Sequence, residues 1–176
     1  MIFYLRVALL APGVILHEFS HHILCLISGV RVHKAVYFRV GNPAGYVIHE
    51  EPLLYRQIFA IVAGPFFLNS AVAVVLLNLA LRQWAAATDT LGFAVAVIMT
   101  WLGISVGPQA IPSRADAGNL FHSSNHHLFH GNPFAALGYP VALAVFVVQM
   151  ARPLGSEWYY TLFMAFLAQR GFAGLS

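Results

Sequence analysis

The sequence predicts an α-helical integral membrane protein with four to five transmembrane helices and a small β-hairpin after the first of them. Of its 176 residues, 60% are hydrophobic and only 9% are charged, whereas a soluble domain is about 45–50% apolar and about 25% charged. The hydrophobic residues form long runs, as helices that cross a membrane require. A turn signal between two short strand-like segments follows the first run.

Five apolar runs are long enough, or nearly so, to cross about 30 Å of hydrocarbon. They lie near residues 5–28, 57–81, 91–107, 134–151 and 157–170. The last two are short for a perpendicular crossing, so one of them is a candidate for a re-entrant or interfacial segment. No internal repeat or linker divides the chain, and we therefore expect residues 1–176 to form one membrane-embedded domain.

The segment from Val30 to Glu51 predicts the β-hairpin. Two stretches rich in Val, Tyr and Phe flank the turn sequence Gly-Asn-Pro-Ala-Gly at residues 41–45. Open strand edges are not tolerated against lipid, so we expect this hairpin at the membrane interface or beside a cavity enclosed by protein.

The charges exclude one class of function and indicate an orientation. The nine Lys and Arg residues are scattered singly and form no basic patch, which excludes nucleic acid as a partner. Arg31, Lys34 and Arg39 lie in the loop after the first span, so we expect residues 30–55 on the cytoplasmic side of a multi-pass protein of the cell membrane. Cys25 is the only cysteine, so no intrachain disulfide can form.

The sequence His17-Glu18-Phe19-Ser20-His21 is an HExxH motif inside the first apolar run. Histidines four residues apart project from one face of a helix, so both imidazoles can bind one Zn²⁺ ion. Glu18 then lies beside the open coordination position, where it can act as the general base. Because Glu and His are costly within a membrane span, a functional reading is favoured over an incidental one.

A catalytic zinc site usually has three protein ligands, and we predict that Asp116 is the third. Pro108 and Pro112 precede it and predict irregular backbone at membrane depth. The alternative is an ordinary interfacial carboxylate paired with Arg114.

These features together resemble the site-2 protease family of intramembrane metalloproteases. The resemblance covers about residues 10–120 and has three parts in the order of the family. They are the HExxH motif, an Ala-Gly-Pro sequence at residues 63–65 followed by Asn69, and the proline-preceded Asp116.

The resemblance implies a zinc ion held by His17, His21 and Asp116, with Glu18 as the general base. It also implies a transmembrane protein as substrate, which must unwind locally in the lipid bilayer before cleavage. Asn69 would help to bind that substrate, and the hairpin could hold the unwound segment by β-strand addition.

A second interpretation stays open, since His17 to His22 also fits the HxxxHH box of membrane desaturases and hydroxylases. His122 to His127 repeats the same spacing. Such boxes ligate two irons that activate O₂, but the remaining histidines, His33 and His49, form no third box. The histidine cluster from His122 to His130 has three possible interpretations. The simplest is a polar loop at the membrane surface, and the other two are a secondary metal site and a pH-sensitive gate. A third class is a non-catalytic membrane protein that only binds metal.

Overall fold

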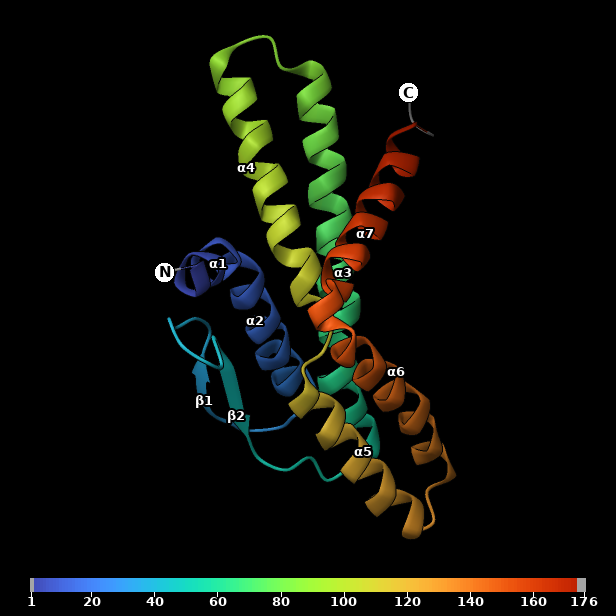
Figure 1. The fold of residues 1–176 in the computed structure, drawn as a ribbon. Coiled ribbons are helices and arrows are strands. Elements are labelled where there is room, and N and C mark those ends of the chain that lie inside the picture. The colour runs from blue at the N-terminus through green and yellow to red at the C-terminus, as the bar shows by residue number, and fades with distance from the viewer. Residues whose placement is uncertain (1, 174–176) are drawn as a thin grey trace.

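The computed structural model describes residues 2–173, and this part of the chain is mostly helical (Figure 1). Its helices and strands, in chain order, are α1 (Ile2–Leu9), α2 (Ala11–Ile27), β1 (Val32–Val36), β2 (Tyr46–His49), α3 (Tyr55–Ala86), α4 (Thr90–Val106), α5 (Arg114–Phe129), α6 (Gly138–Met150) and α7 (Ser156–Ala173). Short 3₁₀ turns lie at Gly107–Gln109, Pro133–Leu137 and Arg152–Leu154.

Helix α3 is the central element and runs along most of the length of the molecule (Figure 1). Helices α2, α4, α5 and α7 all pack against it. Its apolar composition sustains a continuous helix of 32 residues despite Pro65 in the interior. At Gly64 a β-carbon would lie 2.3 Å from the side chain of Leu24, so glycine leaves the space into which this leucine of α2 packs.

Three helical segments are long and apolar enough to cross a membrane. They are Tyr55–Ala86, Thr90–Phe129 and Pro133–Met150, and they correspond to three of the five expected spans. The remaining two expected spans are not of this kind among the described residues. The first is divided between α1 and the 17-residue α2, and the last, α7, carries Glu157 and Arg170.

The division of the first expected span has a local cause. Pro12 occupies the first turn of α2, where its fixed φ favours the start of a new helix. The backbone N–H of Gly13, which has no helical partner so close to the helix start, donates to Oγ of Ser105 on α4 at 2.8 Å. This contact anchors the beginning of α2, the helix that carries the HExxH motif.

The predicted hairpin is confirmed. Strands β1 and β2 pair antiparallel, with Val36 opposite Tyr46 and Ala35 opposite Val47. The ring of Tyr37, which follows β1, stacks on His22 of α2, and its hydroxyl bonds to the Nδ1 of that histidine. The hairpin is thereby held beside α2.

The polar segment from Gly107 to Pro133 is only partly irregular. The break between helices is confined to residues 107–113, and residues 114–129 form helix α5. The interpretation of the histidine cluster as a polar loop was therefore wrong up to Phe129. Ser113 caps this helix and accepts from the backbone N–H of Asp116, which is why the helix begins directly after the proline-containing turn.

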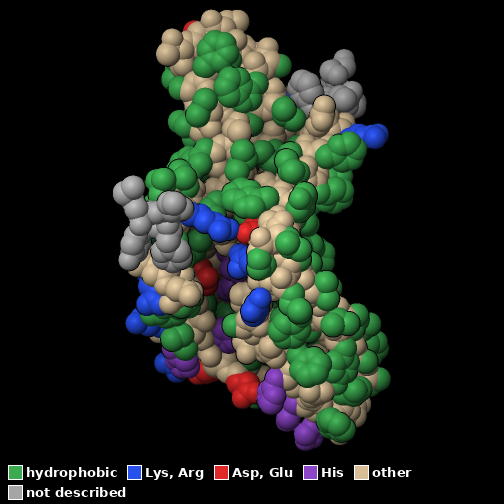
Figure 2. Space-filling model, viewed as in Figure 1, with side chains coloured by type: hydrophobic (Ala, Val, Ile, Leu, Met, Phe, Trp, Pro, Cys, Tyr) green, Lys and Arg blue, Asp and Glu red, His purple; other side chains and the backbone are tan. Residues whose placement is uncertain are grey.

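Large hydrophobic side chains are exposed over much of the helical surface (Figure 2). They include Phe67 and Val75 on α3, Val97 on α4, Leu143 on α6 and Leu162 on α7. Contiguous apolar surface of this extent is unusual for a protein in water. The cores between the helices are small, for example Leu77, Met164 and Ala168 between α3 and α7.

Candidate metal centre

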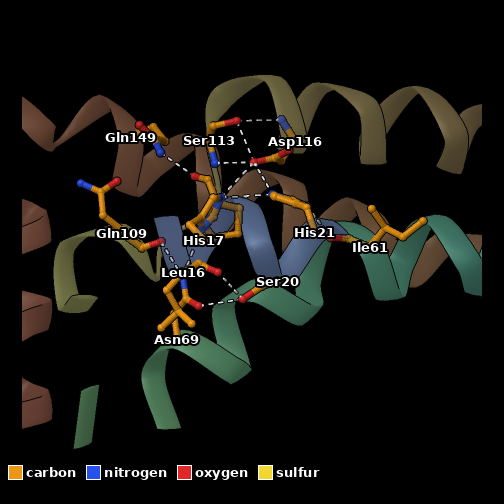
Figure 3. A network of polar contacts seen from close by, with 11 residues as sticks. Leu16, His17, Ser20, His21, Ile61, Asn69, Gln109, Ser113, Asp116 and Gln149 are labelled. Atoms are coloured by element: carbon orange, nitrogen blue, oxygen red, sulfur yellow. Dashed lines mark hydrogen bonds and ion pairs between the residues drawn. The ribbon is translucent and has the colours of Figure 1, made fainter. Parts of the chain in front are cut away.

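The structure brings together the three residues expected to bind a metal. His17 and His21 project from α2 toward the first turn of α5, which carries Asp116 (Figure 3). The two Nε2 atoms lie 3.1 Å apart. Oδ2 of Asp116 lies 3.9 Å from Nε2 of His17 and 3.7 Å from Nε2 of His21. Among the described residues, these three are the group of His, Cys, Asp or Glu side chains whose possible ligand atoms all lie within 4.8 Å of one another.

These separations fit one bound ion. Ligands placed tetrahedrally at about 2.0–2.1 Å from zinc lie about 3.3 Å from one another. The three separations in the structure, 3.1, 3.7 and 3.9 Å, lie within about 0.6 Å of that value. Two imidazoles with one carboxylate form a donor set typical of catalytic zinc, which leaves a fourth position for water or substrate. The same donors are also the facial set of non-haem iron.

His21 is oriented by an irregularity of α3. Its Nδ1 donates to the backbone carbonyl oxygen of Ile61 at 2.9 Å, which leaves the lone pair of Nε2 for a metal. In a regular helix that carbonyl would accept from the N–H four residues later, but residue 65 is a proline and has none. Pro65 therefore frees the acceptor that His21 uses.

His17 is supported from behind by Asn69 of α3. The side-chain amide of Asn69 is fully buried, and its Nδ2 lies 3.4 Å from Nδ1 of His17. The same amide group contacts Oγ of Ser20 at 3.0 Å and the backbone oxygen of Gln109 at 3.3 Å. The amide nitrogen is a donor, so Nδ1 of His17 is the acceptor of this contact, and rotation of the amide group by 180° would present its oxygen instead.

These contacts of Asn69 are with protein groups, and Asn69 does not line the cavity beside the metal centre. The structure thus places this residue behind a candidate metal ligand. Its expected contact with substrate stays a prediction from the family resemblance.

Asp116 is held by a capping box at the start of α5. Its Oδ2 accepts from the backbone N–H of Ser113 at 2.8 Å and from the hydroxyl of Ser113 at 2.7 Å. Arg114, the partner weighed in the alternative interpretation, instead donates to the backbone oxygen of Gln149 at 3.2 Å. Gln149 in turn donates from its buried amide to the carbonyl of Pro112 at 2.5 Å. Helix α6 thereby secures the turn that presents Asp116.

Glu18 lines one large cavity together with the three candidate ligands. The cavity measures about 1240 Å³ and is bounded by α2, the hairpin turn, α3 and α5. At Gly45, a β-carbon would lie 2.6 Å from Cγ of Glu18 and 3.0 Å from the backbone oxygen of Tyr37. The hairpin turn is therefore packed directly on the Glu18 side chain.

Other histidines of the two expected iron-binding boxes do not join this centre. His22 bonds to Tyr37, and the histidines from His122 onward lie farther along α5. The sequence did not predict three residues that support the candidate metal ligands, namely Ser113, Ile61 and Gln149. Of these, Ser113 carried a readable signal, the Ser-x-x-Asp spacing of a capping box.

The chain was also compared with known proteins. It matches no protein-family model, no curated protein and no solved structure.

Proposed function

We propose that this protein is an integral membrane zinc metalloprotease that cleaves peptide bonds within or near transmembrane segments of other membrane proteins. The observation that carries the proposal is the convergence of two buried histidines and one aspartate, with Glu18 lining the same cavity. The three long apolar helices and the apolar exterior support residence in a lipid bilayer.

His17, His21 and Asp116 would hold the zinc ion. When bound, zinc supplies Lewis-acid activation of water and of the scissile carbonyl. Glu18 accepts a proton from the attacking water as the new C–O bond forms, and it then donates this proton to the leaving amine as the peptide C–N bond breaks. This role explains a carboxylate beside the centre that metal binding alone does not require.

The substrate segment would enter as extended chain. A cavity of about 1240 Å³ accommodates several residues of a peptide, since small-molecule pockets span about 300–1,000 Å³. A peptide bond within a helix is sterically enclosed, so the segment must unwind before it reaches Glu18. Strand β2 borders the cavity through Tyr46, Val47 and His49 and supports an arrangement in which the hairpin binds the unwound segment by strand addition.

The di-iron oxygenase is the competing function, and two observations favour the protease. An aspartate, rather than a second histidine box, completes the group around His17 and His21. The extra histidine of the first box, His22, is engaged by Tyr37.

The decisive experiment combines metal content with cleavage. The protein would be purified in detergent, dialysed against metal-free buffer and assayed for bound metals by elemental analysis. Cleavage of a transmembrane peptide would be followed in liposomes. We expect one tightly held zinc per chain, lost in Asp116→Ala, and cleavage that is abolished in Glu18→Gln although this variant retains zinc.

Two other outcomes would contradict the proposal. About two irons per chain would identify the oxygenase. One zinc per chain, with identical cleavage in the wild type and Glu18→Gln, would show that the protein binds zinc but that Glu18 is not the general base.

A further inference from the structure

Helix α5 carries a row of histidines that the proposed protease does not use. His122, His126 and His130 follow one another at intervals of four residues, so they lie on one face of the helix and its C-cap. All three are exposed. We call these three residues the histidine stripe. Figure 2 shows histidine side chains gathered at the end of the molecule where α5 ends.

The last two members of the stripe are already side by side. The rings of His126 and His130 are stacked, with centroids 4.3 Å apart and planes inclined by 27°. Because the ring of His126 is exposed, rotation about its side-chain torsions can turn one of its nitrogens toward an ion bound by His130. Two imidazoles one helical turn apart are the same arrangement that presents His17 and His21 to the inner centre.

A hydrogen bond to the backbone fixes which nitrogen of the His130 ring carries the proton. Nδ1 of His130 donates to the backbone carbonyl oxygen of His126 at 2.7 Å. The lone pair of Nε2 is then directed outward, and no described residue bonds to it. Histidines that ligate metals usually donate their other ring N–H to a carbonyl or carboxylate in this way.

The neighbouring His127 is differently placed. It is partly buried, and its ring lies edge-on to that of Tyr55 on α3, with centroids 5.8 Å apart. His127 therefore faces α3 rather than the exposed side of α5. It lies on the same helix turn as His126 but is not part of the stripe, so it can serve as a control.

We propose that His126 and His130 form a second metal site, which binds a borderline divalent transition ion such as Zn²⁺, Ni²⁺ or Cu²⁺ through two imidazoles and water. Neutral imidazole suits these ions and disfavours Mg²⁺ and Ca²⁺. With two protein ligands and no carboxylate, the site binds more weakly than the inner centre.

The stripe reaches the cavity of the inner centre through one of its members. His122, one turn nearer to Asp116, lines that cavity together with His49, Glu50 and Glu51 from the end of the hairpin. These four residues add donor groups for a divalent cation to the wall of the cavity that also holds the inner centre.

The test is an isothermal calorimetric titration of the metal-free, tag-free, full-length protein in detergent with Zn²⁺. The main variant is His126→Ala, because His126 belongs to both possible pairs of the stripe. The matched controls are His127→Ala, on the same turn, and the double variant His33→Ala/His49→Ala, which removes histidines of the hairpin. Far-UV circular dichroism would verify that each variant is folded.

We expect two classes of Zn²⁺ site in the wild type. His126→Ala should lose the weaker class only, both controls should keep it, and His17→Ala/His21→Ala should lose the tighter class only. A wild type without a weaker class, or a weaker class that survives in His126→Ala, would overturn the proposal. Because each pair of histidines governs its own class, failure of this site is distinguishable from failure of the inner centre.

Discussion

The backbone carbonyl oxygen of Ile61 accepts the Nδ1 proton of His21 across 2.9 Å, and it is available because Pro65 lacks the N–H that would otherwise occupy it. A single proline in α3 thus determines how a side chain of α2 is oriented. Gly64, directly before it, leaves the space that the side chain of Leu24 on α2 occupies. Through these two residues, the sequence Ala-Gly-Pro shapes the contact between α3 and the helix that carries the candidate ligand His21.

Replacing Pro65 by alanine should weaken zinc binding. The new N–H competes with His21 for the oxygen of Ile61, and loss of such a supporting bond typically lowers metal affinity about 10–100-fold. The affinity would be measured by competition with a chromophoric chelator, and circular dichroism should show undiminished helix. Phe67→Ala, at an exposed position of the same helix, is the control. Equal affinities of Pro65→Ala and the wild type would refute the role of the proline.

Ser113→Ala should disturb both α5 and the metal centre. It removes the N-cap hydroxyl, at a cost of about 1 kcal/mol in stability, and it frees the Asp116 carboxylate from one of its two bonds to Ser113. We expect a lower thermal midpoint together with weaker zinc binding. Ser113→Thr retains the hydroxyl and should restore both properties, whereas a deficit shared by the threonine variant would argue against capping as the cause.

Asn69 distinguishes a positioning role from a role in substrate binding. In Asn69→Leu, the support behind Nδ1 of His17 is lost, and zinc affinity should fall by about 10–100-fold. Asn69→Asp replaces the amide N–H that faces Nδ1 of His17 by an acceptor, which suits an imidazole protonated at Nδ1, and it should lose less affinity. The opposite result, a raised KM for the peptide with zinc affinity unchanged in both variants, would instead support the substrate contact expected from the family resemblance.

Gly45→Ala should reduce cleavage without releasing zinc. The added methyl group meets Cγ of Glu18 at 2.6 Å and the backbone of the hairpin at 3.0 Å, so either the carboxylate or the turn must move. Gly41→Ala is a matched control in the same turn, since its nearest neighbour is the flexible side chain of Arg39 at 3.7 Å. Peptide cleavage and zinc content would be measured for both; a fully active Gly45→Ala would show that this contact does not constrain Glu18.

The expected orientation in the membrane can be tested by cysteine labelling. Cys25 is fully buried, so a cysteine introduced at the exposed Asn42 should be the main reactive thiol. If the 30–55 loop is cytoplasmic, an impermeant maleimide should label Asn42→Cys in inside-out vesicles and not in intact cells. Labelling of intact cells would place the hairpin on the other side.

Local pattern sufficed for the hairpin, for three of the apolar helices and for two of the candidate metal ligands. The spacing of His17 and His21 places both on one helix face whatever surrounds them, and the turn sequence between two β-rich stretches specified the hairpin. The polar composition of residues 114–129 concealed a helix, because the capping bonds of Ser113 and packing against α3 and α6 outweigh weak apolar periodicity.

Only the tertiary structure decided what surrounds those ligands. Asp116 joins the histidines because α5 folds back across α2, a contact over about a hundred residues that no local spacing encodes. The supporting oxygen of Ile61 is a backbone atom whose availability depends on a proline four residues later and on the close packing of two helices. Sequence determines which side chains can bind a metal, whereas long-range packing decides which of them meet and in which proton state they are held.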